Sequence, residues 1–227
     1  MYGGSITGNT SSPAGGVYVG ENGTFNMNGG EITGNTSSSY GGGVYVYNGA
    51  EFTMTGGSIT DNAASSKNKS NGGGVYSAGT FTMTGGSITG NKAKYGGGVW
   101  TGADASFTVS GNVNITDNVN ITDKTASNVY LAGNSITIGN GKLKSEAKIG
   151  VTYSHEDKIA TGEFVTIATG AKGSCTVDNF TADAGEPYGI KVERNGAYVD
   201  VNLYNGLPHE HPICGKTCGH TGTHTNI

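Results

Sequence analysis

The stretch GGGVYVYNGAEFTMTGGSITDN, from Gly41 to Asn62, decides the fold because its pattern recurs along the first half of the chain. Within it, apolar and polar residues alternate in three short runs, which are Val44 to Val46, Phe52 to Met54 and Ser58 to Thr60. Alternation with a period of two is typical of a strand with one apolar face. Asn-Gly, Gly-Gly and Asp-Asn pairs follow the runs and suit tight turns. One unit therefore predicts three strands and three corners.

The same unit recurs before and after this stretch at nearly constant spacing. Its marker residues are the valines that open the first run, the phenylalanines of the second and the isoleucines of the third: Val17, Val44, Val75 and Val99; Phe25, Phe52, Phe81 and Phe107; Ile6, Ile32, Ile59, Ile88 and Ile115. Successive isoleucines are 26, 27, 29 and 27 residues apart, and the variation falls almost wholly in one corner. Fixed strands joined by one corner of variable length indicate stacked coils.

A coil of three short strands cannot bury its inward side chains alone, but coils stacked roughly 4.8 Å apart bury them in one continuous core. We therefore predict an all-β fold, a right-handed parallel β-helix with three strands and about 27 residues per coil. The hand follows from the strong bias of parallel crossover connections. A β-propeller is excluded because each blade needs about 40 residues.

The composition restricts the class of partner. The chain has 227 residues, of which 42 are glycines placed periodically at corners, so this glycine content does not indicate disorder. The net charge is −4 and Arg194 is the single arginine, whereas a nucleic-acid surface needs a basic stripe. No apolar run approaches the length of a membrane span. We expect no nucleic-acid partner and no membrane span in this fragment.

Three segments are expected along the chain. Residues 1–149 form the coils, of which the last is predicted from the alternation at 129–131 and 136–138. Residues 150–206 form a C-terminal β segment that caps or extends the helix, with a hairpin turn at Arg194-Asn195-Gly196. Its strands are expected at residues 149–153, 164–167, 175–177, 189–192 and 198–203. Residues 207–227 hold too few apolar residues for a core and are expected to be a linker or metal knot.

The first nine residues, MYGGSITGN, align with MNGGEITGN at Met27 to Asn35, so the chain begins in the middle of a coil. An uncovered β-helix end exposes strand edges that intact proteins protect. We therefore expect the sequence to be an excerpt of a longer protein with an export signal upstream.

The repeated GGGVY and GGSITGN blocks resemble the right-handed β-helix repeat regions of large secreted or surface proteins of gut Gram-positive bacteria. They are also similar to the GG and FxxN repeats of polymorphic outer-membrane adhesins, although the second motif here reads FTM and the asparagine comes later. The resemblance covers about residues 1 to 140, and the His/Cys tail resembles segments that join repeat regions in such proteins. It implies an adhesin-like module joined to further modules of the same chain.

The tail crowds together four histidines and two cysteines: His209, His211, Cys214, Cys218, His220 and His224. Thiolates and imidazoles close in sequence can hold a tetrahedral zinc ion, which would staple a segment that has no core. An extracellular chain equally favours a Cys214–Cys218 disulfide with solvated histidines. Structural zinc is thus the one candidate cofactor, and both alternatives stay open. Cys175 is expected to be a buried apolar residue in a strand.

One outward position per coil carries an aromatic residue, and these candidate ligand contacts are Tyr18, Tyr45, Tyr76, Trp100 and Tyr130. Stacked coils place them in an exposed column. Aromatic rings suit sugar rings or partner proteins because each offers a large contact area at little entropic cost. Alternatively, neighbouring rings simply cover each other and the sheet, as aromatic cross-strand pairs do.

Two further sets of polar residues recur at fixed places. An asparagine follows each third run, and these residues are expected to form a structural hydrogen-bonded ladder: Asn9, Asn35, Asn62, Asn91 and Asn118. Outward hydroxyls along the second run, such as Thr53 and Thr82, suggest an ice-binding surface as a minor alternative. Solvated side-chain ladders explain these columns more simply, and Asn26 and Asn28 interrupt them.

Many β-helices degrade polysaccharides, so a polysaccharide lyase or glycoside hydrolase is the main alternative. Such an enzyme needs carboxylates clustered around calcium with a basic residue, or paired carboxylates on neighbouring coils. The repeat region has no arginine, and its acids are scattered: Glu21, Glu31, Glu51, Asp61, Asp104, Asp117 and Asp123. His155, Glu156 and Asp157 cluster further on without a nucleophile signature. We expect no catalytic residues.

The sequence therefore predicts a non-enzymatic extracellular module, either secreted or attached to the cell surface. Its expected partners are host or microbial glycans or surface proteins. The contacts are expected from the aromatic column and from the long loop at Ala63 to Asn71.

Overall fold

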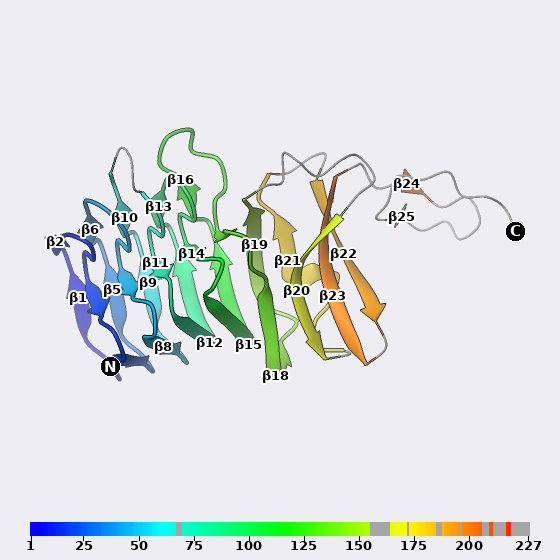
Figure 1. The fold of residues 1–227 in the computed structure, drawn as a ribbon, viewed down its shortest axis with the longest axis horizontal. Coiled ribbons are helices and arrows are strands. Elements are labelled where there is room, and N and C mark those ends of the chain that lie inside the picture. The colour runs from blue at the N-terminus through cyan, green and yellow to red at the C-terminus, as the bar shows by residue number, and fades with distance from the viewer. Residues whose placement is uncertain are drawn as a thin grey trace, which may run out of the picture.

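The computed structural model describes residues 1–66, 70–154, 164–171, 173–184, 188–195, 197–205, 209–210 and 217–218. The strands stack along one axis from the N-terminal to the C-terminal end (Figure 1). Neighbouring coils pair in parallel, and the solenoid makes about six turns of about 27 residues each. The predicted all-β parallel fold is confirmed, and the winding is consistent with the expected right hand.

Three faces of the solenoid carry the three predicted strands of each coil. The first face contains β3 (Val17–Val19), β7 (Val44–Val46), β11 (Val75–Ser77), β14 (Val99–Thr101), β17 (Val129–Leu131) and the second half of β19 (Lys148–Tyr153). The second face contains β4 (Thr24–Met27), β8 (Glu51–Met54), the first halves of β12 (Thr80–Thr89) and β15 (Ser106–Thr116), and β18 (Ile136–Leu143). The third face contains β1 (Ser5–Thr7), β5 (Glu31–Thr33), β9 (Ser58–Thr60) and the second halves of β12 and β15.

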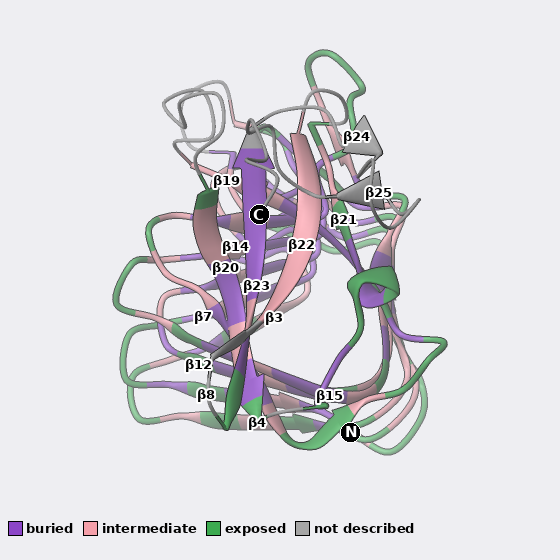
Figure 2. Ribbon diagram, turned by 90° about the vertical axis from the view of Figure 1, so that its right-hand side faces the viewer, coloured by how far each residue is buried: buried purple, intermediate pink, exposed green. Residues whose placement is uncertain are grey.

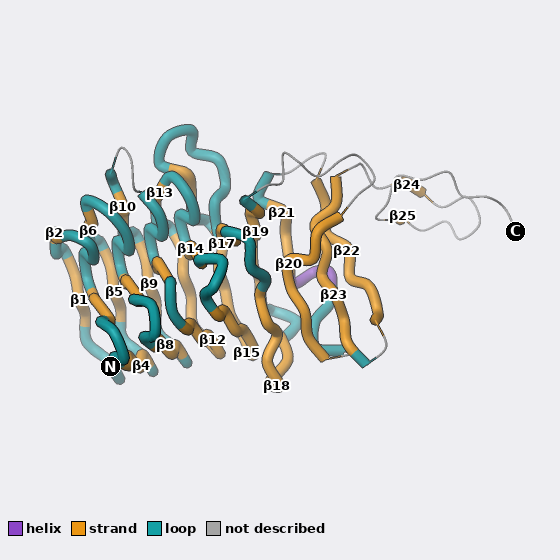
Figure 3. The backbone as a smooth tube through the Cα atoms, in the orientation of Figure 1, coloured by secondary structure: helices purple, strands orange, loops and turns teal. Residues whose placement is uncertain are grey.

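A fourth short strand occupies the corner of variable length, where the sequence predicts a loop. These strands pair in parallel as a separate sheet and are β2 (Thr10–Ser11), β6 (Thr36–Ser37), β10 (Ala63–Ala64), β13 (Lys92–Ala93) and β16 (Val119–Asn120). Two-residue strands carry too little alternation to be recognised from sequence. The loop between β16 and β17 projects from the upper edge of the molecule in Figure 3.

The C-terminal segment first continues the parallel stack and then adds antiparallel strands. β19 pairs in parallel with β21 (Phe180–Ala182). β20 (Phe164–Ala171) pairs in parallel with β18 and antiparallel with β23 (Tyr198–Asn205), whose hairpin partner is β22 (Tyr188–Asn195). Val199, Val201 and Leu203 belong to the same buried cluster as the coils. In the end-on view of Figure 2, β23 accordingly crosses the end of the core.

The predicted strand at residues 175–177 is wrong. Cys175 is buried as expected, but it lies outside any strand, and the 3-10 turn η2 (Val177–Asn179) begins two residues later. The side chain of Asn179 accepts a hydrogen bond from the backbone N–H of Thr176 at 2.9 Å. This local bond favours a capped turn over an extended strand.

In the isoleucine and phenylalanine columns of the core, like residues lie above like residues. Ile59 pairs with Ile32 on one side and with Ile88 on the other. The rings of Phe52 and Phe81 stack with their centroids 4.9 Å apart and their planes within 4° of parallel. Figure 2 shows the buried residues lining the inside of the coils and the exposed ones gathered on the outer turns. Burying a side chain of this size contributes roughly 1.5–3 kcal/mol, so each coil repeats the same stabilisation.

Glycines that precede the first face are required by the close approach of adjacent coils. A Cβ atom on Gly42 would lie 2.3 Å from the carbonyl oxygen of Gly73, and one on Gly73 would lie 2.3 Å from that of Gly97. These distances are far below van der Waals contact, so no side chain fits between these turns. The glycine repeat therefore permits the β spacing between coils at this corner.

Replacing Gly73 with alanine should destabilise the protein by about 1–3 kcal/mol, because the new methyl group overlaps backbone atoms that cannot move independently. The measurement is the free energy of unfolding from urea denaturation. Gly3→Ala is the matched control, since nothing lies within 4 Å of a Cβ there, and it should change stability by less than about 0.5 kcal/mol. Equal effects of the two substitutions would contradict the stacking of Gly73 on Gly97.

Candidate functional site

The predicted aromatic column is a stack of rings on the first face. The centroid distances are 5.2 Å between Tyr18 and Tyr45, 4.8 Å between Tyr45 and Tyr76, and 4.5 Å between Tyr76 and Trp100. The planes of neighbouring rings lie within 16° of each other. Each ring inside the stack therefore has both faces covered by its neighbours. A sugar ring packs on the face of an aromatic ring, so the interior of the column offers a ligand only ring edges and hydroxyl groups.

The tyrosine hydroxyls in the middle of the column stay neutral. Burial, followed by the neighbouring Tyr45 and Tyr40, raises the pKa of Tyr76 to about 12. Burial also raises the pKa of Tyr45, with smaller contributions from the tyrosines around it. The column is consequently an uncharged surface at physiological pH.

The aromatic column ends near the C-terminal end of the solenoid. Tyr130 pairs with Trp100 in the register of β14 and β17, and Thr152 follows Tyr130 in the register of β17 and β19. The aromatic series thus ends at Tyr130, where a small hydroxyl residue takes the next position. The ring of Tyr95 lies beside that of Tyr130, with the centroids 5.1 Å apart and the planes tilted by 48°. Space for a ligand arises at this end because the next ring is missing.

The predicted asparagine ladder is confirmed. Each asparagine donates from its backbone N–H and from its Nδ2 to the Oδ1 of the asparagine one coil further on, at distances of 2.9 to 3.0 Å. The ladder joins Asn9, Asn35, Asn62, Asn91 and Asn118, and the last four are fully buried. Buried amides that are all satisfied in this way fix the height of each coil relative to the next.

The ladder continues beyond the residues that the repeat predicts. Asn118 donates from its N–H and its Nδ2 to Oδ1 of Asn128, both at 3.0 Å. Asn128 donates from its N–H to Oδ2 of Asp183 at 2.5 Å and from its Nδ2 to Oδ1 of Asp183 at 2.7 Å. Asn128 precedes Val129 of β17 as a glycine precedes the first strand of earlier coils. Because an asparagine stands here where earlier coils have a glycine, the repeat pattern does not predict that Asn128 extends the ladder.

The side-chain hydrogen bonds between successive ladder residues all run toward the C-terminal end, where Asp183 accepts the last pair. The Nδ2 atoms of the buried asparagines also donate back to an isoleucine carbonyl of the preceding coil. A carboxylate offers about four acceptor sites and no donor, so it ends a series of donors without a conflict. Hydrogen bonds to a charged acceptor are the stronger kind, and aligned amides polarise one another. Gly150 permits the contact, because a Cβ there would lie 2.3 Å from Nδ2 of Asn128 and 2.4 Å from Oδ1 of Asp183. Asp183 is therefore the acceptor that ends the ladder.

Asn62→Ala should lower the free energy of unfolding by about 2–4 kcal/mol, because the two buried donors of Asn35 lose their acceptor. Asn9→Ala is the matched control at the exposed start of the ladder, and it should cost no more than about 1 kcal/mol. Urea denaturation of both variants checks the difference. Similar losses at the two positions would contradict a ladder whose buried members carry the stability.

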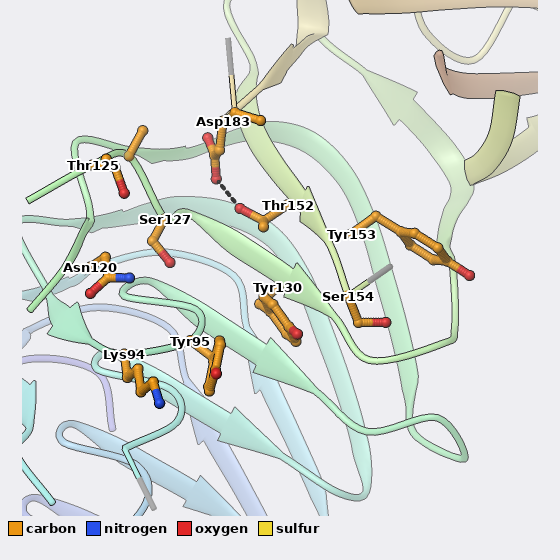
Figure 4. A pocket seen from close by; sticks show the side chains of 12 residues that line it. Lys94, Tyr95, Asn120, Thr125, Ser127, Tyr130, Thr152, Tyr153, Ser154 and Asp183 are labelled. Carbon is orange, nitrogen blue, oxygen red and sulfur yellow. Dashed lines mark hydrogen bonds between the residues drawn. The ribbon is translucent and has the colours of Figure 1, made fainter. Parts of the chain in front are cut away.

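Asp183 also lines a pocket of about 390 Å³ at the C-terminal end of the aromatic column. The pocket is built by residues from five places in the sequence: Lys94 and Tyr95 after β13, Asn120 at the end of β16 with residues 125–127 in the loop that follows, Tyr130 on β17, residues 152–154 at and just after the end of β19, and residues 183–184 after β21. Figure 4 shows the carboxyl group of Asp183 at one end of the pocket beside Thr152, and Lys94 at the opposite end.

The chemistry of the pocket suits a polyol. The hydroxyl of Thr152 donates to Oδ2 of Asp183 at 2.9 Å. Tyrosine rings supply apolar surface, and the hydroxyls and amide on the wall supply donors and acceptors; the polar residues are Asn120, Thr125, Ser127, Thr152, Ser154 and Asp183. Such a mixture of aromatic surface and a few placed polar groups is typical of a ligand site. The sequence alone predicts only Tyr130 as a contact, because the other lining residues do not belong to a recurring column of like residues.

The carboxyl group of Asp183 titrates above its usual range. Burial raises its pKa, and the hydrogen bonds from Asn128 and Thr152, which favour the charged form, only partly oppose this. A raised pKa in the folded state means that the unfolded state binds fewer protons than the folded state between the two pKa values. The contribution of Asp183 to stability is therefore complete below the unfolded pKa and is lost as the pH rises through the folded pKa.

The raised pKa predicts that the contribution of Asp183 to the free energy of unfolding depends on pH, and Asp183→Asn should remove this contribution. The difference in free energy of unfolding between wild type and Asp183→Asn should fall as the pH rises from about 4, the usual pKa of an aspartate. Other carboxyl groups are common to both proteins and cancel in the difference. Urea denaturation at several pH values measures it, and a difference that instead grows with pH would contradict the raised pKa.

Four of the acids considered for catalysis, Glu31, Glu51, Asp61 and Asp117, lie on two faces and one corner of the described coils. Asp61 and Asp117 adopt left-handed backbone, with φ of 55° and 59°, at the corner where Gly34 has φ of 64°. They are turn residues. Glu31 pairs with serines on the third face, and Glu51 pairs with threonines on the second. Among the described residues, no group of three or more His, Cys, Asp or Glu side chains is placed to hold a metal ion.

Several predicted residues fall outside the described part of the chain: His155, Glu156 and Asp157, the loop residues 67–69, and the tail residues His211, Cys214, His220 and His224. In the tail, β24 (His209–Glu210) and β25 (Thr217–Cys218) pair antiparallel, which sets the backbone of His209 opposite that of Cys218. Zinc binding and a Cys214–Cys218 disulfide both stay predictions. The hydroxyl column places Thr53 between Asn26 and Thr82, and ice binding likewise stays a prediction.

Comparison with protein-family models, curated proteins and solved structures gives no significant match. In the described residues, no helix is long and apolar enough to cross a membrane.

Proposed function

We propose that this chain is a non-enzymatic, adhesin-like extracellular module that binds glycans in the pocket between Tyr130 and Asp183. The observation that carries the proposal is the missing ring at Thr152, which leaves a space beside Tyr130 that is bordered by a carboxylate and several hydroxyls. A pyranose has a flat C–H face and a rim of hydroxyls. It matches a site that offers an aromatic ring and hydrogen-bonding groups together.

The architecture and the sequence support an extracellular role. Its repeats resemble those of bacterial surface adhesins, and a stiff solenoid can hold a binding site away from a cell surface. The scattered acids of the repeat region support binding without turnover. A secreted or surface-attached setting, with glycans of a host or of other microbes as partners, follows from this resemblance.

The experiment is a glycan array followed by calorimetry on the glycans that bind. Tyr130→Ala should weaken binding about three- to tenfold, because one aromatic contact of the sugar ring is lost. Tyr18→Ala is the matched control at the other end of the same column and should leave affinity unchanged. Assays for reducing sugar and for unsaturated products run on the same glycans, and they should detect no turnover.

Three results would contradict the proposal. Binding that is lost in Tyr18→Ala but kept in Tyr130→Ala would place the site at the wrong end of the column. The release of sugar products would show an enzyme. The absence of binding to any glycan would remove the glycan role altogether.

A further inference from the structure

We propose that the pocket selects a sugar that carries a positively charged amino group, with the ammonium placed against Asp183. This inference rests on the proposed glycan function and names the class of sugar. Three features of the pocket carry it: a half-buried carboxylate with no counter-charge among the described residues, hydroxyl oxygens that line the same pocket, and aromatic surface beside it.

Among the described residues, the carboxylate of Asp183 contacts neutral donors alone. It accepts hydrogen bonds from Asn128 and Thr152, and it forms no ion pair with any side chain in the described part of the chain. A partly buried charge without an opposite charge is unfavourable, and a cation brought by a ligand relieves this. The fixed donors also hold the carboxylate in place before the ligand arrives, which lowers the entropy lost on binding.

The pocket offers enough acceptors for an ammonium group. An ammonium has three donors. The hydrogen bonds that Asp183 receives fill three of its roughly four acceptor sites and leave one for a ligand. Oxygen atoms of Ser127 and Thr125 line the same space, as Figure 4 shows. Their hydroxyls can accept as well as donate, so they can complete the shell of a cation.

The aromatic side of the pocket favours a cation as well. The face of a tyrosine ring carries negative partial charge and attracts a nearby ammonium. Tyr95 and Tyr130 supply such rings to the wall. The carboxylate and the tyrosine rings therefore both attract a cation, whereas Asp183 would repel the carboxylate of a sugar acid.

Lys94 is the positive group in the lining, and it does not cancel this preference. Its side chain is exposed, and its Nζ lies 5.1 Å from the centroid of the Tyr95 ring. Figure 4 places it at the end of the pocket away from Asp183. Water and salt screen an exposed charge much more strongly than a half-buried one. Asp183 thus dominates the field where the ammonium would sit.

The test compares three β-1,4-linked trisaccharides that differ only at C2 of each ring: those of glucosamine, N-acetylglucosamine and glucose. Calorimetry on the full chain at about pH 6 keeps the amine protonated. The glucosamine trimer should bind at least about tenfold more tightly than the glucose trimer. The ratio should shrink when the ionic strength is raised from about 0.05 M to about 0.5 M.

Variants then assign the preference to Asp183. Asp183→Asn should weaken binding of the glucosamine trimer more than binding of the glucose trimer, and so bring the ratio of their affinities close to one. Asp104→Asn is the matched control, since Asp104 lines a separate pocket beside Trp100, and it should keep the ratio. Circular dichroism checks that Asp183→Asn is folded. Should this variant unfold, the wild-type ratio and its salt dependence still decide the matter.

The outcomes separate this inference from the proposed function. Equal binding of the three trimers would overturn the selection of an amino sugar and leave glycan binding intact. A simple diamine such as 1,5-diaminopentane that binds as tightly as the glucosamine trimer would also overturn it, because the sugar would then contribute nothing. If no trimer and no glycan on the array binds, both proposals fail.

Discussion

Hydrogen bonding between successive coils is the constraint on which the rest of the structure depends. In the isoleucine, phenylalanine and asparagine columns, each coil presents the same type of residue at the same height as the coil before it, so backbone, amide and ring contacts form together. Ile59 between two isoleucines, Phe52 on Phe81 and Asn62 in the amide ladder are examples. The glycines at the entry to the first face are the positions where the same spacing leaves no room for a side chain.

This constraint explains why most of the fold could be predicted from the sequence. The regular recurrence of Val44, Phe52 and Ile59 in other coils fixes strands, corners and stacking together. The short strands of the variable corner could not be predicted, because two residues show no alternation. The turn at 177–179 was missed because it depends on a hydrogen bond from Thr176 to Asn179, which has no counterpart in the repeat.

The candidate site could be predicted only in part, and the reason is physical. The repeat shows which residues stack on one another in successive coils. The pocket, however, lies where the aromatic column ends, and the repeat does not show that position. The column stops where Thr152 replaces a ring, and the ladder stops where Asp183 replaces an amide. Neither substitution stands out in a segment where the repeat has already faded. The column and the ladder end close together. The carboxyl group of Asp183 therefore both accepts the last hydrogen bonds of the ladder and lines the pocket.

The most direct test of the account is a methyl NOE experiment on the protein with its isoleucines labelled. Coils stacked in register roughly 4.8 Å apart predict strong cross-peaks between Ile32 and Ile59 and between Ile59 and Ile88. The pair Ile32 and Ile88, two coils apart, should give a much weaker signal. Cross-peaks that are missing between adjacent coils, or that join residues out of this order, would contradict the parallel in-register stack.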